Sequence, residues 1–477
     1  MRTDFDGDMA AYWQENSTLV ETELKNLVDS QFNRLQTLDT EAYKLLCRLG
    51  CFRYQDVPRV SSDALLALLW DVPEDKQRSV IKSLRNRCLV EFEKGEYWLH
   101  PIIREQGIER LKSSGEWEEV NRKAANFWTE NVKSIETIED ARRAFEAYYH
   151  YFEIHDYEQS ASVILKGRNN KWESNESLGY SFFRLGILQI LIYVINLLFK
   201  INVELSDYHS SEIYKLLGDL YWLSGNISQA IECHNIAINK INKYFTYKDI
   251  SYQAEYKITS VRLSCWINLG LCYLELKELN KAHVFLNKVN LAVGDNNLFH
   301  QSTSSAFLLA FLNSCFGDTE LAYDFALKAE RDIDLYSDKR DSWIKGYSRI
   351  FLALTYKNLK DEIRAFSMYN QAIDYAENSN YTQVKAKALT GLAELYRIQG
   401  YFEKALSNHS QSIELLDKIG AKCDLAEAYY QLGLTYQKMG ETENSNTSFD
   451  EAIRLFNEME APKQVEKVEN SKRGNID

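Results

Sequence analysis

A short fragment that recurs along the C-terminal two-thirds of the chain constrains its fold more than any other feature. A leucine is followed by a small residue and then, three positions on, by a tyrosine, at residues 217–221, 269–273, 352–356, 392–396 and 432–436. Twelve positions after the small residue comes a second one: Ala230, Ala282, Ala365 and Ala405 follow the first four fragments, Ala322 follows a further small residue at position 310, and Ser445 takes the position in the last copy. Small residues at this spacing allow two antiparallel helices to cross closely. The pattern therefore predicts helical hairpins repeated along the chain.

The distribution of prolines and glycines agrees with hairpins of helices. The chain has four prolines, and none lies between residues 102 and 461. A segment of that length without a helix breaker is typical of stacked helices. Four glycines lie seven positions after the small residue, where each hairpin should turn: Gly225, Gly317, Gly400 and Gly440.

The repeats resemble the tetratricopeptide repeat, with their small residues at positions 270, 310, 353, 393 and 433. The resemblance implies an all-α fold with a right-handed α-solenoid, which we expect over residues 116–462. Residues 134–203 fit the pattern loosely, and residues 182–202 are expected to form one long apolar helix. The charged tail, residues 463–477, is expected to fray.

A different module precedes the repeats, at residues 37–115. Helical periodicity covers residues 39–49 and 61–69, and Pro73, Glu74 and Asp75 open a third helix that should end near Arg87. Residues 89–92 and 96–99 alternate as two strands around a turn. Three helices followed by a β-ribbon predict a winged helix. Residues 1–36, with a helix at 24–35, are predicted to be a helical linker segment.

Three segments of this module, LLALLW at 65–70, LRNRCLV at 84–90 and YWLHPIIR at 97–104, resemble the winged helix of bacterial STAND signalling ATPases of the NB-ARC type. Such proteins commonly carry tetratricopeptide repeats behind it. The resemblance implies docking onto a nucleotide-binding domain and maps a nucleotide-sensing role to His100. Leu99 and Pro101 replace the methionine and aspartate of the family signature.

Motifs for catalysis are missing from the sequence. There is no GxxxxGK[ST] loop to cradle phosphates, so we expect a protein that is not an enzyme and binds no cofactor. The chain could be the sensor half of a split STAND protein, with a separate nucleotide-binding domain as partner, or a truncated STAND ATPase. The sequence leaves this open.

Charge and cysteine usage restrict the partners further. The net charge of −13 argues against nucleic acid as a general partner. The alternative is a transcription regulator whose third helix contacts DNA through Arg78, Lys82 and Arg85. Eight cysteines without paired spacing indicate reduced thiols in the cytoplasm and no metal site. The apolar stretch 185–199 is shorter than the ~20 residues that span a membrane.

The remaining prediction is a non-enzymatic sensor or scaffold that binds a protein or peptide in a concave groove. The first helix of each repeat should line this groove through its ninth and twelfth positions. These positions are Asp219, Trp222, Leu271, Leu274, Leu354, Lys357, Glu394, Arg397, Leu434 and Gln437.

Overall fold

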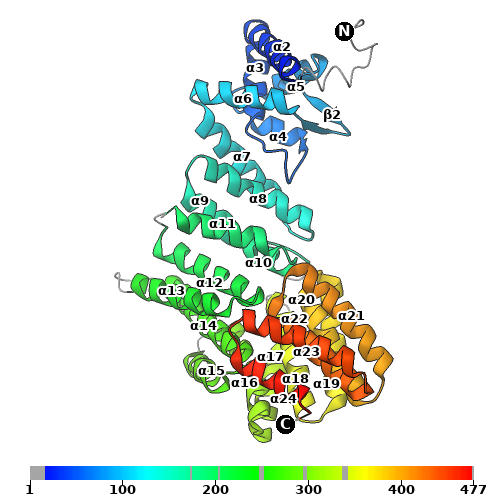
Figure 1. Ribbon diagram of the computed structural model, residues 1–477. Helices are drawn as coiled ribbons and strands as arrows, with labels where there is room; N and C mark the ends of the chain where they lie inside the picture. Colours follow the sequence, from blue (N-terminus) through cyan, green and yellow to red (C-terminus); the bar gives the residue numbers. More distant parts are fainter. Residues whose placement is uncertain are drawn as a thin grey trace, which may run out of the picture. The chain divides into compact units, whose positions relative to one another are not determined.

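The computed structural model describes residues 17–171, 175–201, 205–245, 252–293, 298–335 and 342–474. These residues are mainly helical, as predicted, with a few very short strands (Figure 1). Contacts divide the chain into two compact units. Unit 1 comprises residues 1–133 and 142–163, and unit 2 comprises residues 134–141 and 164–477.

Unit 1 begins with a helix, continues with three helices and a small sheet, and ends with further helices. Its elements are α2 (Ser17–Leu38), α3 (Thr40–Leu49), β1 (Val60–Ser61), α4 (Ser62–Ala67), α5 (Glu74–Asn86), β2 (Glu91–Glu93), β3 (Glu96–Trp98), α6 (Pro101–Ser114), α7 (Trp117–Asn131), α8 (Ile138–Glu153) and α9 (Tyr157–Leu165). The strands are antiparallel in the order β1-β3-β2, with Tyr97 between Val60 and Phe92. Strand β1 was not expected. The helices and the ribbon follow the predicted order, and the winged-helix assignment stays a prediction. Residues 1–16 of the predicted linker lie outside the described residues.

A buried arginine joins the helices of unit 1. The side chain of Arg48, on α3, is 1% exposed and forms two hydrogen bonds with Asp71, at 2.6 and 2.9 Å. Its Nε donates to Glu116 at 3.0 Å, and its guanidinium lies 3.9 Å from the ring centroid of Trp70. Hydrogen bonding to Arg48 holds the pKa of Asp71 well below its usual range. A buried charge is tolerated here because its donors are satisfied.

Unit 2 is an α-solenoid of stacked hairpins. After the pair β4 (Gly167–Arg168) and β5 (Glu176–Ser177) come α10 (Leu178–Arg184), α11 (Leu188–Lys200), α12 (Asp207–Leu223), α13 (Ile227–Phe245), α14 (Tyr252–Glu275), α15 (Leu279–Val293), α16 (Phe299–Phe316), α17 (Thr319–Leu335), α18 (Ser342–Asn358), α19 (Glu362–Ser379), α20 (Thr382–Ile398), α21 (Phe402–Ile419), α22 (Lys422–Met439), α23 (Thr442–Glu458) and α24 (Pro462–Lys472). Helices α12 to α23 pair as successive hairpins, and Figure 1 shows them stacked.

The turns within the hairpins confirm the predicted glycine positions. Gly225, Gly317, Gly400 and Gly440 have φ of 85°, 79°, 81° and 82°, in the left-handed region that favours glycine. Lys277 and Lys360 adopt the same conformation at the equivalent positions, with φ of 57° and 62°. Hairpin geometry therefore imposes this turn even where the side chain opposes it.

The second small residue of each repeat is where the paired helices touch. All five alanines at this position are completely buried. In the last repeat, Ser445 takes the position, and its hydroxyl donates to the carbonyl of Gly433 at 2.9 Å. The serine is tolerated because its hydroxyl is satisfied inside the hairpin.

Two predicted elements are wrong. The single helix expected over 182–202 is broken into α10 and α11 at Gly186, whose φ is 75°; Asn202 lies outside the described residues. The tail does not fray over residues 463–472, which belong to α24. This helix buries Gln464, Val468 and Ser471 and covers the last hairpin, so the packing and hydrogen bonds of its inner face outweigh its charged composition. Residues 475–477 lie outside the described residues.

A feature that the repeats did not predict joins early and late parts of unit 2. Helices α10 to α14 contact the segment from the end of α19 to α24, and we call this contact the seam. It is made by a set of polar bonds: Arg184 to the carbonyl of Ser379 (2.9 Å), Cys423 Sγ to the carbonyl of Trp222 (3.1 Å), Gln464 to the carbonyl of Glu275 (2.9 Å) and Ser228 to Glu460 (2.8 Å).

Candidate functional site

The ten predicted groove residues fall into two groups in the structure. All lie on the first helices of their hairpins, α12, α14, α18, α20 and α22. Asp219, Trp222 and Leu271 are buried. The other seven are half-buried: Leu274, Leu354, Lys357, Glu394, Arg397, Leu434 and Gln437. The more exposed group therefore extends from the end of α14 to α22. Whether these positions bind a partner stays a prediction.

Asp219 belongs to a polar cluster inside the solenoid. Its carboxylate accepts hydrogen bonds from the Tyr180 hydroxyl at 2.6 Å and from Asn268 Nδ2 at 2.5 Å. His234 Nε2 lies 3.6 Å from the same carboxylate. Burial raises the pKa of Asp219 to about 7. This residue joins α10, α12 and α14, and a partner could not reach it without displacing these contacts.

Charged groove residues link neighbouring repeats. Lys357 Nζ lies 2.7 Å from Glu394 Oε2, and Arg397 lies 3.5 Å from the other oxygen of Glu394. Arg397 also donates to the side-chain oxygen of Gln431 at 2.8 Å. Burial works against ionisation of Glu394, yet the charges of Lys357 and Arg397 hold its pKa below its ordinary value. The Glu394 carboxylate is therefore paired with both cations.

Similar polar pairs occur at each step from α12 to α24. A side chain of one first helix bonds to the next first helix, or to α24 at the end of the series: Asn268 with Asp219, Gln301 with Ser260, Asn358 with Ser314, Gln383 with Asp424, and Gln437 with the carbonyl of Ser471. Pairs of this kind fix one repeat against the next. The series was not recognised in the sequence, although the repeat spacing of about forty residues was its signal.

The leucines at the groove positions of the same helices do not take part in these polar pairs. Leu274, Leu354 and Leu434 are half-buried, so part of each side chain is open to solvent. Apolar groups beside paired charges are typical of protein-binding faces, in which apolar contact supplies affinity and the charges supply specificity.

The other predicted site residues lie in unit 1. His100 is exposed and caps α6, where its Nδ1 accepts a hydrogen bond from the Ile102 amide at 3.4 Å. The three basic residues predicted for DNA, Arg78, Lys82 and Arg85, are all exposed on α5. Arg85 lies over the ring of Phe92, 3.8 Å from its centroid.

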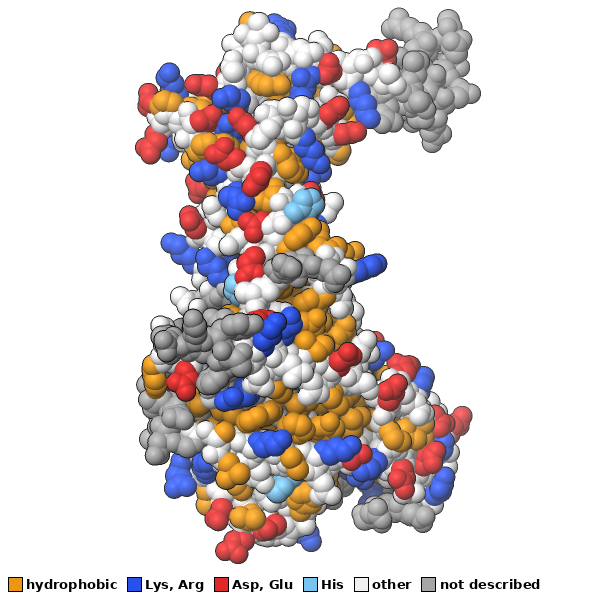
Figure 2. Space-filling view, turned by 90° about the vertical axis from the view of Figure 1, so that its left-hand side faces the viewer, with side chains coloured by type: hydrophobic (Ala, Val, Ile, Leu, Met, Phe, Trp, Pro, Cys, Tyr) orange, Lys and Arg blue, Asp and Glu red, His pale blue; other side chains and the backbone are white. Residues whose placement is uncertain are grey.

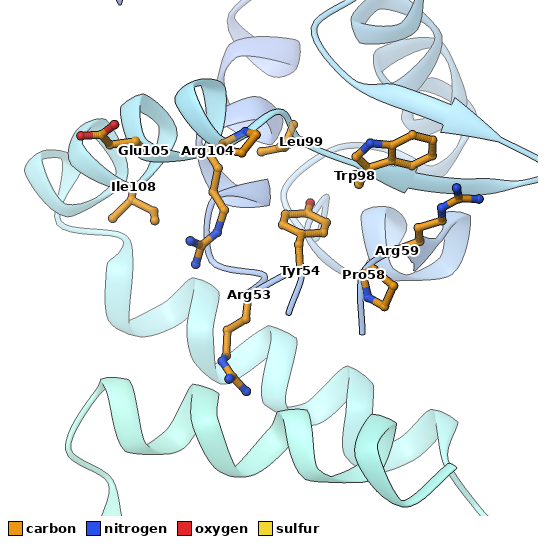
Figure 3. Close-up of a pocket in the computed structure, with 10 residues that line it drawn as sticks. Arg53, Tyr54, Pro58, Arg59, Trp98, Leu99, Arg104, Glu105 and Ile108 are labelled. Atoms are coloured by element: carbon orange, nitrogen blue, oxygen red, sulfur yellow. The ribbon is translucent and has the colours of Figure 1, made fainter. Parts of the chain in front are cut away.

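Unit 1 also has a pocket of about 540 Å³ that sequence reasoning missed (Figure 3). Its polar lining consists of Arg53, Arg59, Arg104, Glu105 and Tyr54, and its apolar lining of Pro58, Trp98, Leu99, Pro101 and Ile108. These residues come from the loop before β1, the end of β3 and the start of α6. The pairing of β1 with β3 and the contact of α6 with the loop after α3 bring them together, so no local sequence pattern predicted the pocket.

Metal and membrane sites receive no support from the described residues. They contain no cluster of three His, Cys, Asp or Glu side chains placed to hold a metal ion. Cys47 and Cys51 are both buried, and burial raises the pKa of Cys47 to about 11. Within the described ranges, every helix is too short or too polar to cross a bilayer.

The surface of unit 2 carries apolar side chains. On the face seen in Figure 2, they gather in the region of α11 to α14, with lysines and arginines scattered beside them. Exposed apolar areas of this kind mark interaction surfaces.

Comparison with known proteins supports the repeats. The tetratricopeptide-repeat family models match residues 347–379 and 384–458, which cover most of α18 to α23. None of the curated proteins matches the chain. The repeats support a protein-interaction or sensor module.

Several solved structures are similar. One is a Signal Transduction ATPase with Numerous Domains (STAND) protein with a tetratricopeptide-repeat sensor from Pyrococcus horikoshii, at 16% identity and a TM-score of 0.48, with 95% of this chain covered. The chain spans 62% of that protein's length. A Rap protein complexed with competence and sporulation factor has 14% identity and a TM-score of 0.47, over 75% of this chain and 98% of its own. The Rap conjugation gene regulator of plasmid pLS20, complexed with the Phr* peptide, has 13% identity and a TM-score of 0.45, over 88% and 97%.

Proposed function

We propose that this chain is a non-enzymatic, cytoplasmic sensor or scaffold that binds a peptide or protein along the first helices of its later repeats. One observation carries the proposal. The half-buried groove residues of α18, α20 and α22 combine leucines with paired charges, and they lie in the hairpins that the tetratricopeptide-repeat models match.

The ligand that suits this face is an extended peptide or an amphipathic helix. Leu354 and Leu434 supply apolar contact, while Lys357, Glu394 and Arg397 offer charges of both signs. Because these charges are already paired, a ligand gains from them only if it replaces the existing pairs with equally good ones. The charges therefore select the register of the ligand more than they add affinity.

Unit 1 receives a separate role in this proposal. Its resemblance to the winged helix of STAND ATPases suggests that it docks onto a nucleotide-binding domain, in the same protein or in another. His100 is exposed at the start of α6 and is available for such a contact.

Variant-dependent capture tests the peptide-binding proposal. The tagged full chain is compared with a Leu354→Lys, Leu434→Lys double variant, and retained proteins are quantified by mass spectrometry. The matched control is Ile363→Lys, because Ile363 is 84% exposed on α19, the second helix of its hairpin. We expect one or more proteins to be retained by the wild type and the control and lost by the double variant. Equal retention by all three, with circular dichroism showing intact folding, would contradict the proposal.

A DNA-binding regulator is the second candidate. The observation that favours it is that Arg78, Lys82 and Arg85 are all exposed and that none has a carboxylate partner in the part of the chain that the structure describes. Salt-dependent retention of duplex DNA that disappears when all three are replaced by glutamine would support it. DNA retention unchanged by those substitutions would reject it.

A further inference from the structure

The pocket of unit 1 has an uneven distribution of charge. Three guanidinium groups line it, against the single carboxylate of Glu105. That carboxylate lies 3.5 Å from Lys25, on α2, and is exposed. Glu105 therefore has a cation of its own outside the pocket and does not neutralise the arginines.

Two of the arginines have carboxylate partners. Arg53 donates to Glu146 at 3.2 Å, and its guanidinium lies 3.4 Å from the ring centroid of Tyr149. Arg59 lies 2.7 Å from Glu93. The positions of these two groups are therefore explained by contacts within unit 1.

Arg104 is different. Its Nε donates to the carbonyl of Phe52 at 2.7 Å, which fixes the orientation of the guanidinium. Among the described residues, no carboxylate lies within ion-pair distance of Arg104. Figure 3 shows its guanidinium reaching between Ile108 and Tyr54. The result is a cation held in place by a backbone carbonyl, which feels the charge of Glu146 at longer range but forms no direct ion pair within the described part of the chain.

The remaining walls are apolar or aromatic. Ile108 and the ring of Tyr54 lie on either side of Arg104, while Leu99 and the ring of Trp98 line the part of the pocket beyond Tyr54 (Figure 3). The volume of about 540 Å³ lies in the range of sites that hold small molecules.

We propose that this pocket binds a small organic anion, with its carboxylate or phosphate head on Arg104 and a flat apolar body against Tyr54 and Ile108. A guanidinium presents two parallel N–H groups that match either head group. The apolar walls exclude water from one side of the pair and strengthen it. Because the lining residues all lie in unit 1, this proposal does not rest on the proposed peptide binding by unit 2.

Matched probes separate the contributions of head and body. Binding of phenylacetate, phenyl phosphate and benzyl alcohol to the full chain is measured by calorimetry, with acetate and inorganic phosphate as heads without a body. We expect at least one phenyl anion to bind more tightly than both benzyl alcohol and its own bare head. Phenylacetate alone would identify a carboxylate ligand, and phenyl phosphate alone a phosphate ligand. Either result supports the proposal.

Variants of pocket residues test whether the anion binds beside Arg104. Arg104→Gln should weaken the bound anion about tenfold or more, which is the usual effect of losing a charge-assisted hydrogen-bonded pair. Arg87→Gln, at an exposed arginine that ends α5 outside the pocket, should leave the affinity unchanged. Ile108→Glu places a like charge beside the head group without altering Arg104, so it gives an independent test if Arg104→Gln does not fold. The proposal is overturned if no phenyl anion binds, if benzyl alcohol binds equally well, or if neither pocket variant reduces the affinity.

Discussion

Replacing one buried histidine should change how the stability of the protein responds to acid. His409, on α21, is completely buried. Because the Thr435 hydroxyl donates to the carbonyl of Gln431, His409 Nε2 must donate to Thr435 Oγ1, which lies 3.0 Å away. Its Nδ1 has no hydrogen-bond partner among the described residues. The ring is therefore neutral, and burial lowers its pKa from 6.5 to about 3.

The sign and size of the effect follow from proton binding. Below pH 6.5 the unfolded chain takes up a proton on this residue, while the folded chain does not until about pH 3. Stability from the neutral ring is therefore complete above pH 6.5 and is lost as the pH falls toward 3. The loss is about 1.4 kcal/mol per pH unit, or about 2 kcal/mol by pH 5.

The variant His409→Phe removes this titration. Tyr369, at the equivalent position of the preceding repeat, shows that an aromatic ring fits there. Urea unfolding is followed by circular dichroism at pH 7.5 and pH 5. Whatever the variant costs at pH 7.5, its stability relative to the wild type should improve by about 2 kcal/mol at pH 5.

The matched control is Tyr369→Phe, because Tyr369 stays neutral throughout this range: burial raises its pKa well above 10. Its stability relative to the wild type should be the same at both pH values. If the same were true of His409→Phe, within about 0.5 kcal/mol, the reasoning from burial would be refuted. His150 and His234, whose pKa burial also lowers to about 3, should give the wild type further acid sensitivity.

Four further variants test the fold. Gly440→Ala should cost about 1 kcal/mol in urea unfolding from backbone strain alone, because φ is 82° and an added Cβ would meet nothing within 4 Å. Lys360→Gly, at the equivalent turn between α18 and α19, should stabilise the protein by less than about 1 kcal/mol, because Lys360 has a φ of 62°. Destabilisation by Lys360→Gly, or no cost of Gly440→Ala, would argue against strain at these turns. Arg48→Met should destabilise unit 1 by about 1 to 3 kcal/mol, because it removes the buried cation that Asp71 and Glu116 share, while Asp71 keeps its salt bridge to Lys44; unchanged urea midpoints would contradict this. Arg184→Met should speed amide hydrogen exchange both in α10 and around Ser379, and an effect confined to α10 would show that the seam bond is unimportant.

The sequence predicted the hairpins well, because their signals recur. A pair of small residues twelve positions apart, repeated along the chain, indicates two helices that cross closely, and the turn between them must then lie about midway, where the glycines occur. The turns at Lys277 and Lys360 have no glycine, so they could be placed only by counting from the small residue. The prediction for the tail was wrong because its charges were weighed more heavily than the inner face that contains Gln464, Val468 and Ser471.

The candidate sites were less predictable. The repeat spacing placed the groove positions on the first helices, yet it did not indicate that Asp219 would be buried in a hydrogen bond with Tyr180. The pocket around Arg104 depends on contacts between distant segments, because Arg104 bonds to the Phe52 carbonyl and β1, a strand of two residues, pairs with β3. A strand so short has no periodicity that a sequence pattern could detect.

The seam changes what can be inferred about the binding face. In an ordinary solenoid each repeat contacts only its neighbours, so the whole inner face would be open. Here Cys423 bonds to the carbonyl of Trp222 across 201 residues, and the positions buried near this contact belong to the early repeats. A ligand that needed Trp222 would have to break the seam, whereas one that used Leu354 and Leu434 would not. If the Leu354→Lys, Leu434→Lys double variant lost its partner while amide hydrogen exchange in α10 stayed unchanged, the ligand would be placed on the later repeats, with the seam intact.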